Sequence, residues 1–146
     1  MRALVQRVRS ASVTVEASGH HAAINEGLLV LLGVMQGDTE ADADWMAGKI
    51  ARLRIFRDDE GRMNRSVEDI KGSVLMISQF TLAGDCRKGN RPSFVATADP
   101  PVGEALYERA IGALRRLDVP VEVGEFGGDM QVELVNDGPF TVMIER

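Results

Sequence analysis

The sequence predicts an α/β domain in which one or two layers of β-sheet carry two helices. Two apolar runs, at residues 28–34 and 74–77, are long enough for buried strands but too short for typical helices. Two other segments, at residues 39–53 and 99–117, instead repeat their apolar residues at helical spacing. With 146 residues, of which 45% are hydrophobic and 27% charged, the chain has the size and composition of a single soluble globular domain.

The first predicted strand covers residues 2–15, where apolar and polar side chains alternate. Residues 17–19 form a turn signal, so residues 20–24 are expected to return as the second arm of a hairpin. His20 and His21 lie at this turn. Because neighbouring residues of a strand point to opposite faces, we do not expect the two rings to bind one metal ion.

The first helix is predicted over residues 39–53. Its start resembles a capping box, Thr39-Glu40-Ala41-Asp42, and apolar residues follow at helical spacing. A short strand should begin at Ile55, and the central strand 73–80 follows a turn. Residues 83–93 then form a long, glycine-rich, basic loop. Loops of this length without regular structure are often functional.

The second helix should begin at Asp99-Pro100-Pro101, because proline is tolerated in the first turn. Its predicted buried stripe consists of Val102, Leu106, Ala110, Ala113, Leu114 and Leu117. Short strands are expected at residues 121–123 and 130–136. Gly138-Pro139 should interrupt the chain before a last strand at residues 140–144.

Composition and charge narrow the class of protein. No apolar run approaches the roughly 18 residues of a membrane span, and the N-terminus lacks the apolar core of a signal peptide. A single cysteine, Cys86, excludes an internal disulfide and suggests a reducing cytoplasm. The net charge of −5 argues against a non-specific nucleic-acid coat. Basic residues are still concentrated at 49–65 and 87–91, where they form either a solvated surface or, if the segments lie together, a phosphate-binding face.

The central strand ends in a run of polar and aromatic side chains, Ser78-Gln79-Phe80-Thr81. Strand ends are where open α/β sheets bind ligands, although a strand that fades into a loop has the same pattern. No HExxH, CxxC, P-loop or GxGxxG motif is present, and no histidine is near Cys86 in the sequence. Hydroxyls, an amide and backbone N–H groups can orient water and stabilise an oxyanion, but they have little acid–base power. Such a site suits a substrate that is already activated, such as the ester of aminoacyl-tRNA.

Two short motifs stand far apart in the chain, Ser78-Gln79-Phe80-Thr81-Leu82 and Asn136-Asp137-Gly138-Pro139-Phe140-Thr141. The opening Gln6-Arg7-Val8 and the loop segment Arg87-Lys88-Gly89-Asn90-Arg91-Pro92-Ser93-Phe94 accompany them. In this order, and in a chain of this length, the four segments resemble the D-aminoacyl-tRNA deacylases, cytosolic enzymes that remove D-amino acids from tRNA. Phe140 departs from the family pattern, which usually has valine there, so the fine shape of the pocket should differ.

The resemblance implies a homodimer that proofreads chirality. In the family, the bond that corresponds to Gly138-Pro139 is cis and reaches into the active site of the partner subunit. Its rigid carbonyl groups would receive the α-amino group, and an L side chain would strike the backbone. Arg7, by similarity, would brace this segment. Because glycine has no Cβ to clash, a filter of this kind should also admit glycyl-tRNA.

The resemblance also assigns the reactive groups. Four consecutive residues form the expected catalytic site: Ser78, Gln79, Phe80 and Thr81. Backbone N–H groups near Phe80 and Thr81 would bind the oxyanion, while the ribose 2′-hydroxyl of the terminal adenosine would activate water. Phe126 and Met130 either contact the adenosine or pack in the core.

The expected architecture is that of the family, a single domain over residues 1–146 with three layers, β/β/α, and two main helices. The expected partners are the 3′ end of aminoacyl-tRNA and a second copy of the chain. No cofactor, metal, DNA or membrane is expected to take part. Two alternatives remain open: a non-catalytic module that binds RNA 3′ ends, and a small-molecule esterase, which is disfavoured because no conventional triad is visible.

Overall fold

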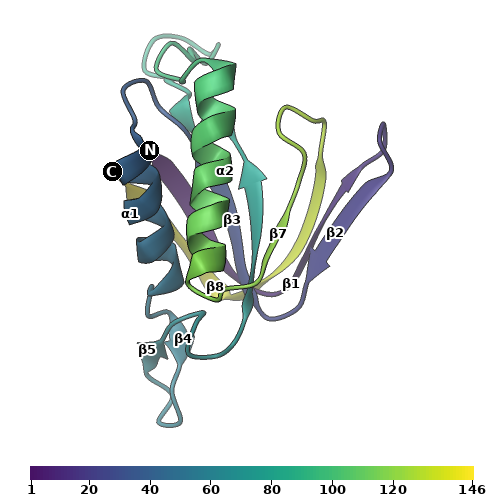
Figure 1. Ribbon diagram of the computed structural model, residues 1–146, viewed down its shortest axis with the longest axis vertical. Helices are drawn as coiled ribbons and strands as arrows, with labels where there is room; N and C mark the ends of the chain where they lie inside the picture. The colour runs from purple at the N-terminus through teal and green to yellow at the C-terminus, as the bar shows by residue number, and fades with distance from the viewer.

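The computed structural model describes residues 1–146 and shows a mixed β-sheet with two helices packed on one face (Figure 1). In chain order the elements are β1 (Arg2–Val15), β2 (His20–Ile24), β3 (Gly27–Gly33), α1 (Glu40–Ala51), β4 (Phe56–Arg57), β5 (Met63–Arg65), β6 (Ser73–Ser78), the short 3-10 helix η1 (Phe80–Ala83), α2 (Pro100–Arg116), β7 (Val121–Val123) and β8 (Gln131–Glu145). The predicted α/β fold with two main helices is confirmed.

The long strand β1 holds the sheet together. Along one edge it pairs antiparallel with β8 over nearly its whole length. Along the other edge its first half pairs with β3 and its second half with β2. The register between β1 and β8 shifts between Gln6 and Ser10, and such bulges bend a strand and increase its twist. The parallel strands β6 and β7 extend the sheet beyond β3.

Two hydrophobic cores lie on opposite faces of β3 and β6, because successive side chains of a strand point to opposite sides. Leu28 and Val30 face the helices and belong to the larger core. Leu29 and Ile77 face the other way, into a smaller core that they share with β2 and the second half of β1. The sheet therefore folds back over itself, which produces the expected three-layer β/β/α arrangement.

Both helices begin within one residue of their predicted starts. The capping box of α1 is present, because the Asp42 carboxylate accepts hydrogen bonds from the Thr39 N–H at 2.9 Å and from its hydroxyl at 2.7 Å. One position of the predicted buried stripe of α2 is wrong. Val102 is 49% exposed, since the first turn of α2 extends past the end of the sheet (Figure 1). Neither helix combines the length and the apolar character that crossing a membrane requires.

The two strands predicted at the C-terminal end form one strand, β8, but its pairing with β1 is interrupted at the predicted place, because residues 137–140 have no partner in β1. Proline has no N–H to give to a ladder, but the Asn136 side chain bridges the gap. It donates to the Phe140 carbonyl at 3.0 Å and accepts from the Phe140 N–H at 3.1 Å. The Asn136 side chain therefore closes a bulge that contains Gly138 and Pro139 within β8.

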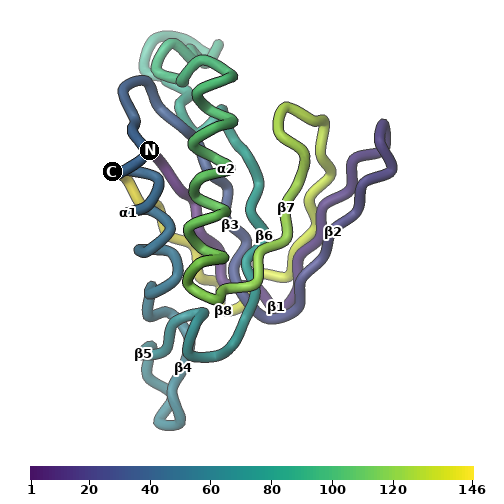
Figure 2. Tube along the Cα trace, in the orientation of Figure 1, coloured from purple at the N-terminus to yellow at the C-terminus, as the bar shows by residue number.

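The two basic segments lie at opposite ends of the molecule. Figure 2 shows the β4–β5 hairpin at one end and the loop of residues 84–97 at the other, beyond the start of α2. The condition for one shared phosphate-binding face is therefore not met within one chain.

Candidate active site

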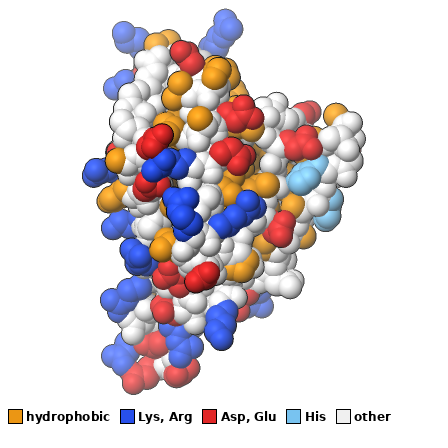
Figure 3. All heavy atoms as spheres, in the orientation of Figure 1, with side chains coloured by type: hydrophobic (Ala, Val, Ile, Leu, Met, Phe, Trp, Pro, Cys, Tyr) orange, Lys and Arg blue, Asp and Glu red, His pale blue; other side chains and the backbone are white.

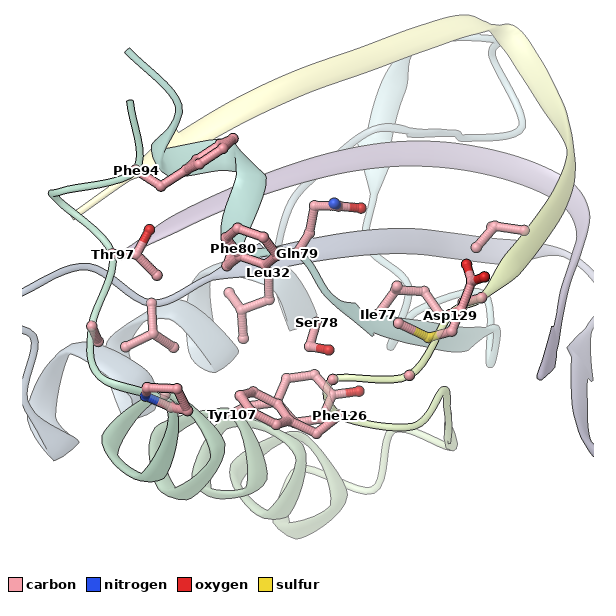
Figure 4. Close-up of a pocket in the computed structure, with 18 residues that line it drawn as sticks. Leu32, Ile77, Ser78, Gln79, Phe80, Phe94, Thr97, Tyr107, Phe126 and Asp129 are labelled. Carbon is pink, nitrogen blue, oxygen red and sulfur yellow. The ribbon is translucent and has the colours of Figure 1, made fainter. Parts of the chain in front are cut away.

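A cavity of about 660 Å³ opens at the C-terminal end of β6 (Figure 4). β6 and the start of η1 form one wall, the first half of α2 a second, and residues 126–132 a third. Five of the nine residues predicted for the site line it: Ser78, Gln79, Phe80, Phe126 and Met130. Thr81 follows the lining residues directly in the chain, and the other three predicted residues lie elsewhere.

Free backbone N–H groups at the mouth of the cavity come from the turn that ends β6. The Gln79 N–H makes the last hydrogen bond to β3, at 2.8 Å. The chain then enters η1, where the Leu82 N–H donates to the Gln79 carbonyl at 3.2 Å. The N–H groups of Phe80 and Thr81 precede that bond, and N–H groups at such positions have no partner within the helix. The predicted strand 73–80 is therefore two residues too long, and the turn that shortens it supplies two donors.

The hydroxyl of Thr81 has no base beside it. It accepts a hydrogen bond from the side-chain amide of Gln79. Both histidines lie outside the cavity: His20 Nε2 is 2.8 Å from the Val123 carbonyl, and His21 Nδ1 is 3.0 Å from a hydroxyl of β1. A protein hydroxyl becomes a strong nucleophile only with a base to take its proton, so nothing around Thr81 activates it.

Phe126 and Tyr107 form a pair of rings along the side of the cavity next to α2 (Figure 4), with centroids 5.9 Å apart. The Tyr107 hydroxyl donates to the Met76 carbonyl at 2.8 Å. Burial raises the pKa of Tyr107, so the phenol stays neutral and positions the wall rather than exchanging protons. Tyr107 was not among the predicted site residues. Its helical spacing from Ala110 and Leu114 was the available signal.

Phe94 and Asp129 also line the cavity, although neither was predicted to do so. They add an aromatic ring and a negative charge. Phe94 packs edge-on against Phe80, with ring centroids 5.2 Å apart. The carboxylate of Asp129, beside Met130 at the rim, is the only one that lines the cavity (Figure 4). Phe94 directly follows the long loop whose length already indicated function. Asp129 carried no signal beyond its position between Phe126 and Met130.

Gly138 and Pro139 are exposed, do not line the cavity and are joined by a cis bond. Arg7, which is only 4% exposed, holds the segment in place. Its Nε donates to the Asp137 carbonyl at 3.2 Å and lies 3.0 Å from the Asp137 carboxylate. The same guanidinium lies over the Phe140 ring, 5.4 Å from its centroid. The segment is therefore braced by a buried cation while its own backbone stays accessible.

This segment lies at the opposite end of the central strands from the cavity. Arg7 pairs with Leu28 of β3, and Leu28 pairs with Val74 near the start of β6. Ser78, at the cavity, lies four residues further along β6. At 3.3 Å per residue, roughly 13 Å along the strands separates the two sites. The structure thus brings five of the predicted residues together and places Arg7, Gly138 and Pro139 apart from them.

No group of three or more His, Cys, Asp and Glu side chains is placed to hold a metal ion. Cys86 is exposed in the basic loop. The groups that the cavity offers are backbone donors, hydroxyls, an amide, aromatic rings and one carboxylate. This set can bind a small ligand and stabilise an oxyanion.

The whole chain is similar to known proteins. Residues 4–145 match a family model described as D-Tyr-tRNA(Tyr) deacylase. A D-aminoacyl-tRNA deacylase of Desulfitobacterium hafniense (strain DSM 10664 / DCB-2) is 56% identical over 145 residues, which cover 99% of this chain and 97% of that protein. A D-aminoacyl-tRNA deacylase of Paracoccus denitrificans (strain Pd 1222) is 57% identical with the same coverage. The resemblance inferred from four short segments is thereby confirmed over nearly the whole chain.

Two solved structures are also similar. One, described as c-Myc DNA Unwinding Element Binding Protein, has a TM-score of 0.92 and 39% identity, and the match covers 100% of this chain and 99% of that one. Another, described as a probable eukaryotic D-amino acid tRNA deacylase, has a TM-score of 0.81 and 21% identity, with 98% and 97% covered. The second likeness concerns the fold alone.

Proposed function

The chain belongs to the D-Tyr-tRNA(Tyr) deacylase family, and we propose on that premise that it hydrolyses the ester bond of D-aminoacyl-tRNA, releasing the D-amino acid and tRNA. The cavity at the end of β6 carries the proposal. Its volume of about 660 Å³ suits one nucleoside with its aminoacyl group, and its apolar walls surround a few hydrogen-bonding groups. The compartment we propose is the cytoplasm, where aminoacyl-tRNA is used and an unpaired, exposed cysteine stays reduced.

The proposed chemical step needs little from protein side chains. Water attacks the carbonyl carbon of the ester, and the N–H groups of Phe80 and Thr81 bind the oxyanion that forms. The ribose oxygen then leaves with a proton. The neighbouring ribose hydroxyl activates the water, a role supported by the absence of histidine from the cavity and of a base at Thr81. Ser78 and Gln79 shape the pocket around the ester.

Phe126 and Met130 are the proposed contacts of the adenosine. An aromatic ring offers a stacking surface, and a methionine side chain adapts to the outline of a base. Both residues line the cavity, and both also pack against a hydrophobic core. Packing in a core and contact with the adenosine are therefore compatible uses of these side chains, because the cavity borders both cores.

Discrimination of handedness is proposed to come from a second copy of the chain. Gly138 and Pro139 are exposed, rigidly braced by Arg7 and too far along the strands to enter the cavity of their own chain. We place them in the cavity of the partner subunit, where their carbonyl groups receive the α-amino group and their backbone excludes an L side chain. Exposed apolar residues on the same strand support such a contact: Leu134, Val135 and Met143.

The activity is tested with tRNA charged with D-tyrosine, L-tyrosine or glycine. Hydrolysis of the D-tyrosyl and glycyl esters, with the L-tyrosyl ester spared, is the expected result. Binding of all three without hydrolysis would instead identify a module for RNA 3′ ends. Rapid hydrolysis of p-nitrophenyl acetate without RNA would identify a general esterase. Complete inertness toward glycyl-tRNA, with D-tyrosyl-tRNA cleaved, would contradict discrimination by exclusion.

The cross-subunit filter is tested by mixing two variants, each of which lacks one half of a selective site. Ser78→Phe fills the cavity but leaves the Gly138-Pro139 segment intact. Gly138→Ala leaves the cavity intact but damages the segment, because the new Cβ would lie 2.8 Å from the Arg7 guanidinium at a φ of +131°. In a mixed dimer one intact cavity meets one intact segment, so random mixing should restore about a quarter of the wild-type sites. No recovery on mixing would show that each chain completes its own site.

A further inference from the structure

We propose that the basic loop, residues 85–93, binds the phosphate backbone of the RNA whose 3′ end occupies the cavity. This inference rests on the proposed function, since it assigns a surface to the RNA substrate of that site. This surface lies outside the cavity. The negative charge of the RNA is on the phosphate groups that precede the terminal nucleoside, and the nucleoside with its aminoacyl group carries none of it.

The ends of the basic loop are attached to the cavity. Asp85 and Ser93 close its stem with two backbone hydrogen bonds, at 2.8 and 3.0 Å. The chain enters the stem from η1 and leaves it at Phe94, which lines the cavity and packs against Phe80. Lys88 is three residues from Asp85 and Arg91 two from Ser93, so both stand within about 10 Å of the stem, since an extended residue spans about 3.3 Å. RNA that leaves the mouth on this side therefore passes the loop.

The basic loop carries concentrated and uncompensated positive charge. Its three basic side chains stand against one carboxylate, a net charge of +2 in a chain whose net charge is −5. Arg87 is paired with Asp85 at 2.6 Å. Lys88 and Arg91 are exposed and form no ion pair within the chain. Figure 3 shows Lys and Arg side chains projecting freely at the end of the molecule where this loop lies.

The other basic segment does not fit the same role. In the β4–β5 hairpin Arg65 pairs with Asp59 and Arg62 with Glu60, so the charge of the segment is only partly neutralised, because Lys49, Arg52, Arg54 and Arg57 form no ion pair. The hairpin, however, lies at the opposite end of the molecule from the cavity mouth (Figure 2). Lys88 and Arg91 are thus the cations whose position and lack of partners suit phosphate groups.

The test measures how the affinity for uncharged tRNA depends on salt. Each phosphate contact to a single strand contributes about 0.7 to the slope of log affinity against log salt, so Lys88→Gln/Arg91→Gln should lower the slope by about 1.4. At 0.1 M salt this corresponds to an affinity about 25-fold weaker. The ratio of kcat/KM for D-tyrosyl-tRNA to kcat/KM for D-tyrosyl-adenosine, which has no phosphate, should fall by a similar factor.

Two matched variants separate the positive charge of the basic loop from the shape of its side chains and from the net charge of the whole chain. Lys88→Arg/Arg91→Lys keeps both charges and should keep the slope. Lys71→Asn/Arg116→Gln removes two charges near the start of β6 and the end of α2, and it should leave the slope unchanged. Asn is chosen because position 71 has a φ of +53°, which Asn tolerates. An unchanged slope in the Gln variant, or an equal loss with D-tyrosyl-adenosine, overturns the inference.

Duplex DNA of similar length serves as a second probe, since one similar structure is described as a DNA-binding protein. Weaker binding to DNA, with little change in the Gln variant, is the expected result. Equal affinity and an equal loss would make the loop a general nucleic-acid surface and overturn its assignment to the RNA substrate. If the wild type hydrolyses no D-aminoacyl-tRNA but the tRNA slopes differ as described, the proposed function fails and the loop assignment stands.

Discussion

The cavity and the Gly138-Pro139 segment differ in almost every property. The cavity has apolar walls, free backbone donors and a single carboxylate at its rim, but no rigid charged brace. The segment has a buried cation, Arg7, that holds an exposed backbone, but it has no cavity. The difference suggests that the cavity provides the catalytic groups and that the Gly138-Pro139 segment discriminates between D- and L-aminoacyl substrates.

The largest expected effect follows from filling the cavity. Ser78→Phe should lower kcat/KM for D-tyrosyl-tRNA by at least about 100-fold, because the ring occupies space that the aminoacyl group needs. Ser78→Ala keeps the space and is the control. Steady-state kinetics and thermal unfolding measure the two consequences. Full activity in the Phe variant would mean that the reaction takes place outside this cavity.

Arg7→Met should have the next largest effect, and on stability first. The change removes the donor to the buried Ile55 carbonyl and the partner of Asp137, at an expected cost of about 2–3 kcal/mol in the free energy of unfolding. The estimate is kept low because the Asp137 side chain is 32% exposed and water can replace its partner. Urea unfolding measures the cost. The preference for D- over L-tyrosyl-tRNA should fall in the same variant.

Arg7→Lys is the matched control for that experiment. It keeps the positive charge but loses the planar group that serves Asp137 and Ile55 at once. An intermediate loss of both stability and preference is expected. If the Met variant keeps its stability and its preference for D-tyrosyl-tRNA, the brace has no part in discrimination.

Thr81→Ala should have a small effect on catalysis. The hydroxyl accepts one hydrogen bond from Gln79 and has no base beside it, so its removal should cost less than about tenfold in kcat. Single-turnover hydrolysis of D-tyrosyl-tRNA measures the chemical step directly. A loss of several orders of magnitude with the fold intact would make Thr81 the nucleophile and remove the need for the ribose hydroxyl.

The smallest expected effect is a loss of stability at acidic pH, and it involves carboxylates outside both the cavity and the Gly138-Pro139 segment. Hydrogen bonds from Arg87 lower the pKa of Asp85 from 3.8 to about 2, and hydrogen bonds from Thr39 lower the pKa of Asp42. A carboxylate with a lowered pKa in the folded state stabilises it fully above its ordinary pKa, and that contribution is lost as the pH falls through the folded value. Stability should therefore hold down to about pH 5 and decline from about pH 4 toward pH 2.

Urea unfolding midpoints at several pH values measure this decline, and Asp42→Asn should remove part of it. The effect should be modest, because neither carboxylate is buried: the side chains of Asp42 and Asp85 are 19% and 41% exposed. A decline that begins above pH 5 would contradict the assignment to these carboxylates.

Short-range patterns explain why so much of the fold was predictable. The apolar run at 74–77 became β6, and Thr39 with Asp42 formed the predicted capping box. These features depend on residues a few positions apart, so the sequence displays them directly. The predictions were wrong where residues far apart in the chain, or side chains that point away from the core, determine the structure. Val102 was predicted to be buried from its helical spacing, but in the first turn of α2 it is 49% exposed.

The candidate site was predictable in part for the same reason. Ser78 to Thr81 are consecutive, so a strand end identified them, and their N–H groups followed from the local turn. Tyr107 and Phe94 are at the cavity because α2 and the basic loop return to it from elsewhere in the chain. No pattern among neighbouring residues indicates that these segments meet at the cavity.

Both helices, the long strands and the polar end of β6 could thus be predicted from the sequence, because hydrogen-bonding patterns and side-chain periodicity act over a few residues, whereas the short strand β5 was not predicted. The tertiary structure alone decided that the two basic segments lie at opposite ends and that Arg7 with Gly138-Pro139 lies away from the cavity. Those separations follow from the register between strands far apart in the chain. Register is set by packing in three dimensions and not by any neighbouring residue.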